Sequence, residues 1–94
     1  MLGLIQTRRC RWKLAEWHLN NARACYEDAG ELTYAAQTEY ALASIPFERQ
    51  DWPAALLALA DARATAQRLP AGDARDRLIP IIDIDIAEAE RHLT

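Results

Sequence analysis

The sequence contains few residues that break helices, crosslink the chain or form flexible linkers. Its 94 residues include three glycines, four prolines and two cysteines, and no stretch rich in Ser, Gly or Pro is present. No apolar run reaches the roughly eighteen residues that span a bilayer, and the first charges follow the short apolar start, opposite to their order in a secretory signal. We therefore expect one ordered domain over residues 1–94, located in the cytoplasm and without a membrane segment.

The residues that commonly carry catalysis or bind metals form no recognisable pattern. Cys10 and Cys25 are fifteen positions apart without a CxxC motif, which favours two reduced thiols over a disulfide. Asp83 and Asp85 form a DxD pair, but on a helix these side chains point in different directions and would not address one ion. Walker, GxSxG, dinucleotide-binding and HExxH motifs are all missing. The sequence therefore predicts neither an enzyme nor a cofactor or metal site.

The net charge of −3 conceals a basic amino-terminal segment. Residues 1–25 carry five basic side chains and one carboxylate, and four of the basic residues surround a tryptophan. Such a combination can bind nucleic acid, but these charges are spread around a helix, and about four phosphate contacts give weak, salt-sensitive binding. This disfavours nucleic acid and leaves a basic surface for an acidic partner peptide, or an ordinary solvated helix end. The residues are Arg8, Arg9, Arg11, Trp12 and Lys13.

Alanine dominates the apolar residues, which favours closely packed helices over strands. Apolar residues recur at helical spacing in four segments with short turns between them. Asp51 is the expected N-cap of the third segment, with Pro53 tolerated in its first turn. The predicted helices cover approximately residues 4–28, 31–49, 51–69 and 73–93.

Each predicted helix has an apolar stripe. The first helix has two such faces, which predicts packing on both sides. One face consists of Trp12, Ala15, Leu19, Ala22 and Tyr26, and the other of Cys10, Leu14, Trp17 and Cys25. The stripes of the other three helices are Leu32, Ala36, Tyr40, Ala43 and Phe47; Trp52, Ala55, Leu56, Leu59, Ala62, Ala66 and Leu69; and Leu78, Ile79, Ile82, Ile86, Ala89 and Leu93.

Two prolines and one alternating segment complicate this pattern. Pro46 predicts a kink or an early end of the second helix, and Pro80 a kink or a new start in the fourth. The segment 82–86 alternates Ile and Asp like an edge strand. Because no second strand is available to pair with it, we interpret the segment as helical.

The segment from Tyr40 to Ala62 has a small residue, Ala43, in one helix, an aromatic residue, Trp52, after a tight Asp turn, and then further alanines. In this arrangement it resembles a tetratricopeptide repeat, in which small residues let paired helices approach closely. A weaker match runs from Ala22 to Leu42, and its turn lies only about twenty residues before the next, against the usual 34. The second helix therefore closes one hairpin and opens the next.

This resemblance covers approximately residues 19–69. It implies an all-α fold in which antiparallel helical hairpins, about four helices in all, stack as a short array similar to tetratricopeptide repeats. The alternative that the residues leave open is a four-helix bundle.

The resemblance also implies a scaffold whose concave face takes a peptide or helix from another protein, with no cofactor and no catalytic residue. We therefore predict an adaptor or regulatory module with a groove between the first two helices and basic residues that attract an acidic partner. The candidate binding residues are Arg8, Arg11, Trp12, Lys13, Trp17, Tyr34 and Tyr40.

Two further functions remain as alternatives. Ile81 and Ile84 fall outside the apolar stripe of the fourth helix, and we expect both to face away from the core. They are therefore candidates for self-association across a two-fold axis, giving a homodimer. The lesser alternative is a nucleic-acid accessory protein that uses the basic first helix.

Overall fold

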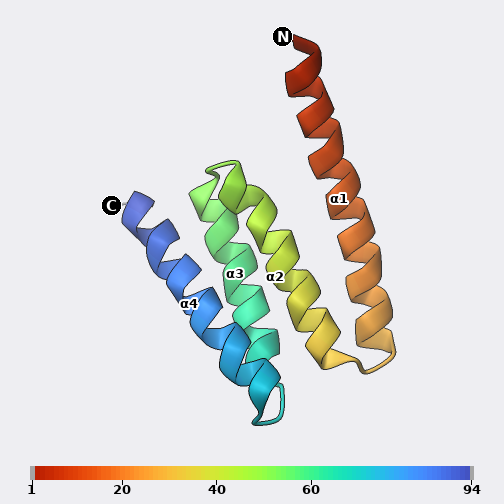
Figure 1. The fold of residues 1–94 in the computed structure, drawn as a ribbon, viewed down its shortest axis with the longest axis vertical. Coiled ribbons are helices and arrows are strands. Elements are labelled where there is room, and N and C mark those ends of the chain that lie inside the picture. Colours follow the sequence, from red (N-terminus) through yellow and green to blue (C-terminus); the bar gives the residue numbers. More distant parts are fainter. Residues whose placement is uncertain (1, 94) are drawn as a thin grey trace.

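The computed structural model describes the backbone of residues 2–93 and the side chains of residues 11–93. Over this range the chain forms four helices, and no strand occurs among the described residues. The all-α prediction is therefore confirmed, and the alternating segment 82–86 belongs to a helix. The helices are α1 (Leu2–Asp28), α2 (Leu32–Glu48), α3 (Trp52–Gln67) and α4 (Asp73–Leu93) (Figure 1).

Consecutive helices run antiparallel and pack side by side (Figure 1). In the described part of the chain, α1 packs against α2 and contacts neither α3 nor α4. α3 packs against both α2 and α4. Because α1 does not return to α4, the four helices form an open array and do not close around one central core. The array is thin, with extents of 47 × 34 × 17 Å.

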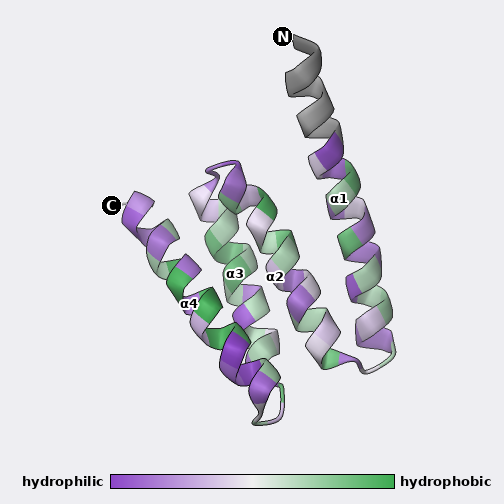
Figure 2. Cartoon of the chain, in the orientation of Figure 1, coloured by the Kyte–Doolittle hydropathy of each residue, from purple (hydrophilic) through white to green (hydrophobic). Residues whose placement is uncertain are grey.

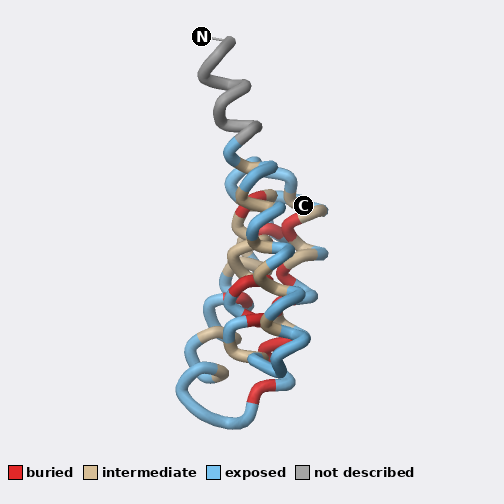
Figure 3. The backbone as a smooth tube through the Cα atoms, turned by 90° about the vertical axis from the view of Figure 1, so that its right-hand side faces the viewer, coloured by how far each residue is buried: buried red, intermediate tan, exposed pale blue. Residues whose placement is uncertain are grey.

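The core lies between α2, α3 and α4. Small residues let these helices approach closely, and Leu59 and Ile82 are the largest side chains that are fully buried. Figure 3 shows the buried residues along the middle of the array, and Figure 2 shows hydrophobic residues concentrated on α3 and the middle of α4. The buried cluster comprises Ala36, Ala43, Leu59, Ala62, Ala66, Leu69 and Ile82.

The predicted stripes of α2 and α3 are confirmed, and that of α4 is confirmed with one exception. Leu93 was expected in the core, but 49% of its surface is exposed. Its neighbour His92 covers the start of α3 instead, with its ring stacked on Trp52 at a centroid distance of 4.1 Å. The final turn of α4 therefore packs through an imidazole, and Leu93 is left at the surface.

α1 is packed on one face only. The stripe from Trp12 to Tyr26 is half-buried against α2, and no residue in 11–28 is fully buried. On the opposite face, Leu14 and Trp17 expose 57% and 60% of their surface, and Cys25 is also exposed. The expectation that α1 packs on both sides was therefore wrong for the described residues, because α2 is the one helix among them that contacts α1. The side chain of Cys10 lies outside the described residues.

The two prolines do not interrupt their helices. α2 continues through Pro46 and ends at Glu48, and α4 continues through Pro80. The packed stripe of α4 keeps its phase across this proline, since Leu78 and Ile79 before it and Ile82 after it all contact the core. Ile81 and Ile84 therefore face outward as predicted, with Ile84 67% exposed.

α1 and α2 end in the same way with different residues. After α1, Gly30 has a φ of 75°, and the amide of Glu31 donates to the carbonyl of Tyr26 at 2.8 Å. After α2, Gln50 has a φ of 61°, and the amide of Asp51 donates to the carbonyl of Pro46 at 2.9 Å. Both ends are Schellman motifs, whose left-handed residue is usually glycine. Asp51 then caps α3 as predicted, accepting from the Ala54 amide.

The Gln50→Gly substitution is expected to raise the free energy of unfolding by about 0.5–1 kcal/mol. Glycine has no Cβ and adopts the left-handed backbone conformation of this position without strain. Its greater conformational freedom in the unfolded chain offsets part of this gain. The reverse change at the matched position, Gly30→Gln, is expected to cost about 1 kcal/mol. Urea denaturation of both variants measures the two effects, and equal shifts of the same sign would contradict the assignment.

Candidate interaction surface

A groove lies between α2 and α4, which run in the same direction (Figure 1) with α3 packed against both. Its volume is about 420 Å³, within the range of roughly 300–1,000 Å³ typical of ligand sites. Apolar side chains from α4 form part of its lining, together with polar and charged groups. The lining residues are Gln37 from α2 and Asp73, Ala74, Arg77, Leu78 and Ile81 from α4.

The groove differs from the site predicted from the sequence, which placed it between the first two helices. Ile81, expected to take part in self-association, instead lines this groove with 45% of its surface exposed. Ile84 follows three positions later, on the same side of α4. Arg77 is exposed and makes no ion pair with any described residue. Sequence analysis missed Arg77 and Gln37, because only the tertiary structure brings α2 beside α4.

Tyr40 joins the two helices that form the groove. Its ring packs against the core, and its hydroxyl donates a hydrogen bond to Asp85 Oδ2 at 2.5 Å. Burial, followed by the hydrogen bond and charge of Asp85, raises the pKa of Tyr40 to about 12. The phenol therefore stays protonated at neutral pH and remains a donor. Tyr40 was a candidate partner anchor, and the structure places it in this internal contact between α2 and α4.

The basic cluster of α1 does not present a free aromatic ring. Trp12 is half-buried, and the guanidinium carbon of Arg49 lies 5.2 Å from the centre of its ring. This cation–π contact occupies the ring that a nucleic-acid base would need for stacking. Arg11 and Lys13 are exposed. The side chain of Arg8 lies outside the described residues.

The remaining candidate anchors, Trp17 and Tyr34, contact different neighbours. Tyr34 is about half exposed and stacks on Tyr26 of α1, with a centroid distance of 5.3 Å and an interplanar angle of 29°. Trp17 meets His18 edge to face at 4.9 Å, on the side of α1 that faces away from α2. The three predicted anchors, Tyr40, Tyr34 and Trp17, therefore lie in three different places and do not form one site.

A buried carboxyl group at the junction of α2 and α3 also escaped the sequence analysis. Glu39 is 7% exposed and accepts a hydrogen bond of 2.7 Å from the Thr65 hydroxyl. Burial is the main cause that raises its pKa; the Thr65 bond opposes this, and Glu27 of α1 raises the pKa further. One signal could have identified it: Glu39 lies midway between Ala35 and Ala43, four residues from each, on the packed side of α2.

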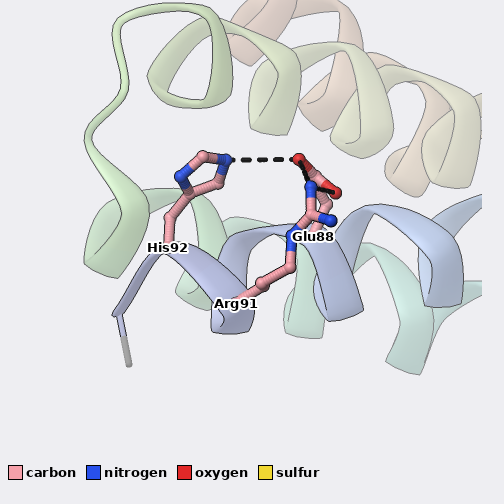
Figure 4. A network of polar contacts seen from close by, with 3 residues as sticks. All are labelled: Glu88, Arg91 and His92. Carbon is pink, nitrogen blue, oxygen red and sulfur yellow. Dashed lines mark hydrogen bonds and ion pairs between the residues drawn. The ribbon is translucent and has the colours of Figure 1, made fainter.

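A polar network closes the end of α4 (Figure 4). Arg91 Nη2 lies 2.5 Å from both carboxylate oxygens of Glu88, and His92 Nε2 lies 3.2 Å from Oε1 of the same carboxylate. The Arg91 hydrogen bond is the main cause that lowers the pKa of Glu88. Since the His92 ring also stacks on Trp52, the network attaches the last turn of α4 to the start of α3.

The two aspartates of the DxD segment have separate partners. Asp83 Oδ1 lies 2.6 Å from Arg63 Nε of α3, while Asp85 accepts the hydrogen bond of Tyr40 from α2. The described residues contain no group of three or more potential metal ligands. None of the helices in the described part of the chain combines the length and hydrophobicity that crossing a bilayer requires.

Comparisons with protein-family models, with curated proteins and with solved structures find no match to this chain. The interpretation of its surface therefore depends on geometry. Two features of the described surface could bind a partner: the groove between α2 and α4, and the exposed apolar face of α1. The first combines an apolar wall with the Arg77 guanidinium, and the second contacts no other helix in the described part of the chain.

Proposed function

We propose that this protein is an interaction module of the tetratricopeptide-like kind, which binds a peptide or helix of another protein in the groove between α2 and α4. The observation that carries the proposal is the combination, in one groove, of the exposed apolar Ile81 and of Arg77, which makes no ion pair with a described residue. Apolar anchors beside an arginine are the usual centre of a protein–protein contact. The module has no catalytic role and no cofactor in this proposal, and its location in the cytoplasm remains a prediction.

The groove defines the chemistry of its partner. Leu78 and Ile81 favour an apolar anchor side chain, while Arg77, which makes no ion pair with a described residue, favours a carboxylate on the partner segment. Because Asp73 also lines the groove, this carboxylate would lie closer to Arg77 than to Asp73. Arg11 and Lys13 are exposed on α1 and add positive charge that attracts an acidic segment during encounter. The expected ligand is therefore a short segment, helical or extended, that presents apolar and acidic residues on the side facing the groove.

The packing of the segment that carries the resemblance supports the proposal. Ala43, Leu59 and Ala62 are all fully buried or nearly so between α2 and α3, and small residues at such positions allow the close helix pairing that this type of array needs. α2 contacts helices on both sides, as a helix shared by two hairpins would. We assign Ile81 to the groove wall in preference to a two-fold contact of α4, because it lines the groove together with Gln37 of α2. Ile84 does not line the groove.

Selection from a displayed library of random peptides tests this function. We expect enriched peptides to combine apolar residues with a carboxylate, and their affinity to fall about tenfold or more in Ile81→Lys and in Arg77→Glu. Both residues are exposed, so neither change should unfold the chain. Isothermal titration with the best peptide gives the dissociation constants.

Leu57→Lys provides the matched control, because Leu57 is 72% exposed on α3 and does not line the groove. This variant should bind the selected peptide as the original chain does. If the library yields no binding sequence, or if all three variants bind equally well, the groove is not the binding site and the proposal fails.

A further inference from the structure

The exposed face of α1 has the spacing of a helix that pairs with another helix. Leu14, Trp17, Asn21 and Ala24 follow one another at intervals of three, four and three residues, and all four are exposed. Intervals of three and four that alternate define the a and d positions of a heptad, the seam along which two helices pack. The stripe buried on α2, from Trp12 to Tyr26, occupies the opposite side of α1. The seam is therefore free along the edge of the array (Figure 1).

We propose that α1 pairs with α1 of a second copy of this chain, antiparallel and across a two-fold axis. The surface is separate from the groove between α2 and α4, so this inference does not depend on the proposed function. A two-fold contact uses the same surface on both copies and closes as a dimer.

The side chains of the seam are complementary in size in the antiparallel register. In antiparallel helix pairs an a position faces a d position, and here the positions whose numbers add to 38 face each other. Leu14 then faces Ala24 of the second copy, and Trp17 faces Asn21 of the second copy. Each layer thus combines one large and one small or polar side chain, which fills the seam without overpacking. A parallel pair would instead place the two Trp17 rings in one layer.

The charges along α1 favour the same orientation. Basic residues are concentrated in its first half, whereas Glu27 and Asp28 stand at its end. In the antiparallel register, Lys13 of one copy flanks the seam beside Glu27 of the other, and the two-fold axis repeats this contact. Both residues are exposed. Lys13 makes no ion pair with a described residue, whereas Glu27 also lies close to the Glu39 carboxyl of α2. A parallel pair would bring the two basic halves together, which like-charge repulsion disfavours.

Sedimentation equilibrium of the full chain tests the pairing. We expect a reversible dimer whose dissociation constant rises about tenfold or more in Trp17→Glu, because two glutamates would then enter the seam. The exposed Leu57→Glu, on α3, should dimerise as the original chain does. Circular dichroism of each variant establishes that the helices remain. A monomer at every concentration, or a dimer that Trp17→Glu leaves unchanged, would overturn the proposal.

Charge reversal tests the orientation without altering the apolar seam. Lys13→Glu should weaken the dimer, because it places a carboxylate beside Glu27 at each of the two symmetric contacts. The combination of Lys13→Glu with Glu27→Lys should restore it, because the pair is reformed with its signs exchanged. Restoration is not expected if Lys13→Glu acts through folding of α1 alone. Failure of the double variant to recover dimerisation would therefore count against the antiparallel register.

Disulfide trapping provides an independent measure of the register. In a chain carrying Cys10→Ser, the two Cys25 residues of an antiparallel dimer lie about 18 Å apart along the axis, too far for a disulfide, so this chain should stay uncrosslinked under mild oxidation. Adding Arg11→Cys places a thiol beside Cys25 of the second copy and should give a crosslinked dimer. Crosslinking through Cys25 alone would show a parallel pair and overturn the proposal.

Discussion

Replacement of Leu59 by alanine is expected to lower the free energy of unfolding by about 2–5 kcal/mol. Leu59 is 1% exposed and packs within the cluster shared by α2, α3 and α4. Four of the six other buried members of this cluster are alanines, and larger side chains such as Tyr40 and Phe47 pack around it partly buried. Because alanine side chains have no rotamers with which to fill a cavity, the part of the space that they line would stay empty. A domain of this size has a total stability of about 5–14 kcal/mol, so the loss is a large fraction of it.

The control for this prediction is Leu57→Ala, which makes the same chemical change two positions earlier on the same helix. Leu57 is 72% exposed, so its replacement should change stability by less than about 0.5 kcal/mol. Urea denaturation, with the helix content followed by circular dichroism, gives both values. Similar losses in the two variants would contradict the position of the core.

The second large effect concerns the dependence of stability on pH. The Glu39→Gln variant is expected to be more stable than the original chain at neutral pH, by an amount on the order of 1 kcal/mol. Glutamine keeps an acceptor for the Thr65 hydroxyl, which lies 2.7 Å from Glu39 Oε2, and it removes a buried negative charge that lies close to Glu27. The desolvation of the carboxylate and its repulsion by Glu27 disappear together.

The sign of the pH effect follows from the raised pKa of Glu39. Between the ordinary value of 4.5 and the higher folded-state pKa, the folded chain keeps a proton that the unfolded chain has released. Its contribution to stability is therefore fully present below pH 4.5 and falls as the pH rises through the folded-state pKa. Glu88, whose pKa is lowered by Arg91, contributes in the opposite direction.

Denaturation of the original chain and of Glu39→Gln across a series of pH values isolates this contribution as the difference between two curves. That difference should grow with pH and then become constant. The exposed Glu90 provides the matched control, and Glu90→Gln should leave the pH dependence of the original chain nearly unchanged. A difference that shrinks as the pH rises would contradict the buried position of Glu39.

The helices and most of the core follow from local sequence. Apolar residues at intervals of three and four place Leu59, Ala62 and Ala66 on one face of α3, and any partner of α3 has to cover that face. The same periodicity predicts that Ile84 faces outward, and it is 67% exposed. The prediction holds beyond Pro80 because the helix continues through this proline, and the residues on either side of it keep the same helical phase. The Asp51 cap is also local, as it involves a neighbour only three residues away.

The position of the groove and the partners of each exposed face were decided by tertiary structure. Periodicity shows that α1 has two apolar faces, but it does not show that only α2 covers one of them. Nor does it show that Tyr40 reaches Asp85, 45 positions later, or that Gln37 and Ile81 line the same groove. Spacing within a helix determines which residues share a face, because the helix is a rigid local object. Which faces meet depends on the packing of separate helices, and this gives the chain a groove between α2 and α4 and an uncovered seam on α1.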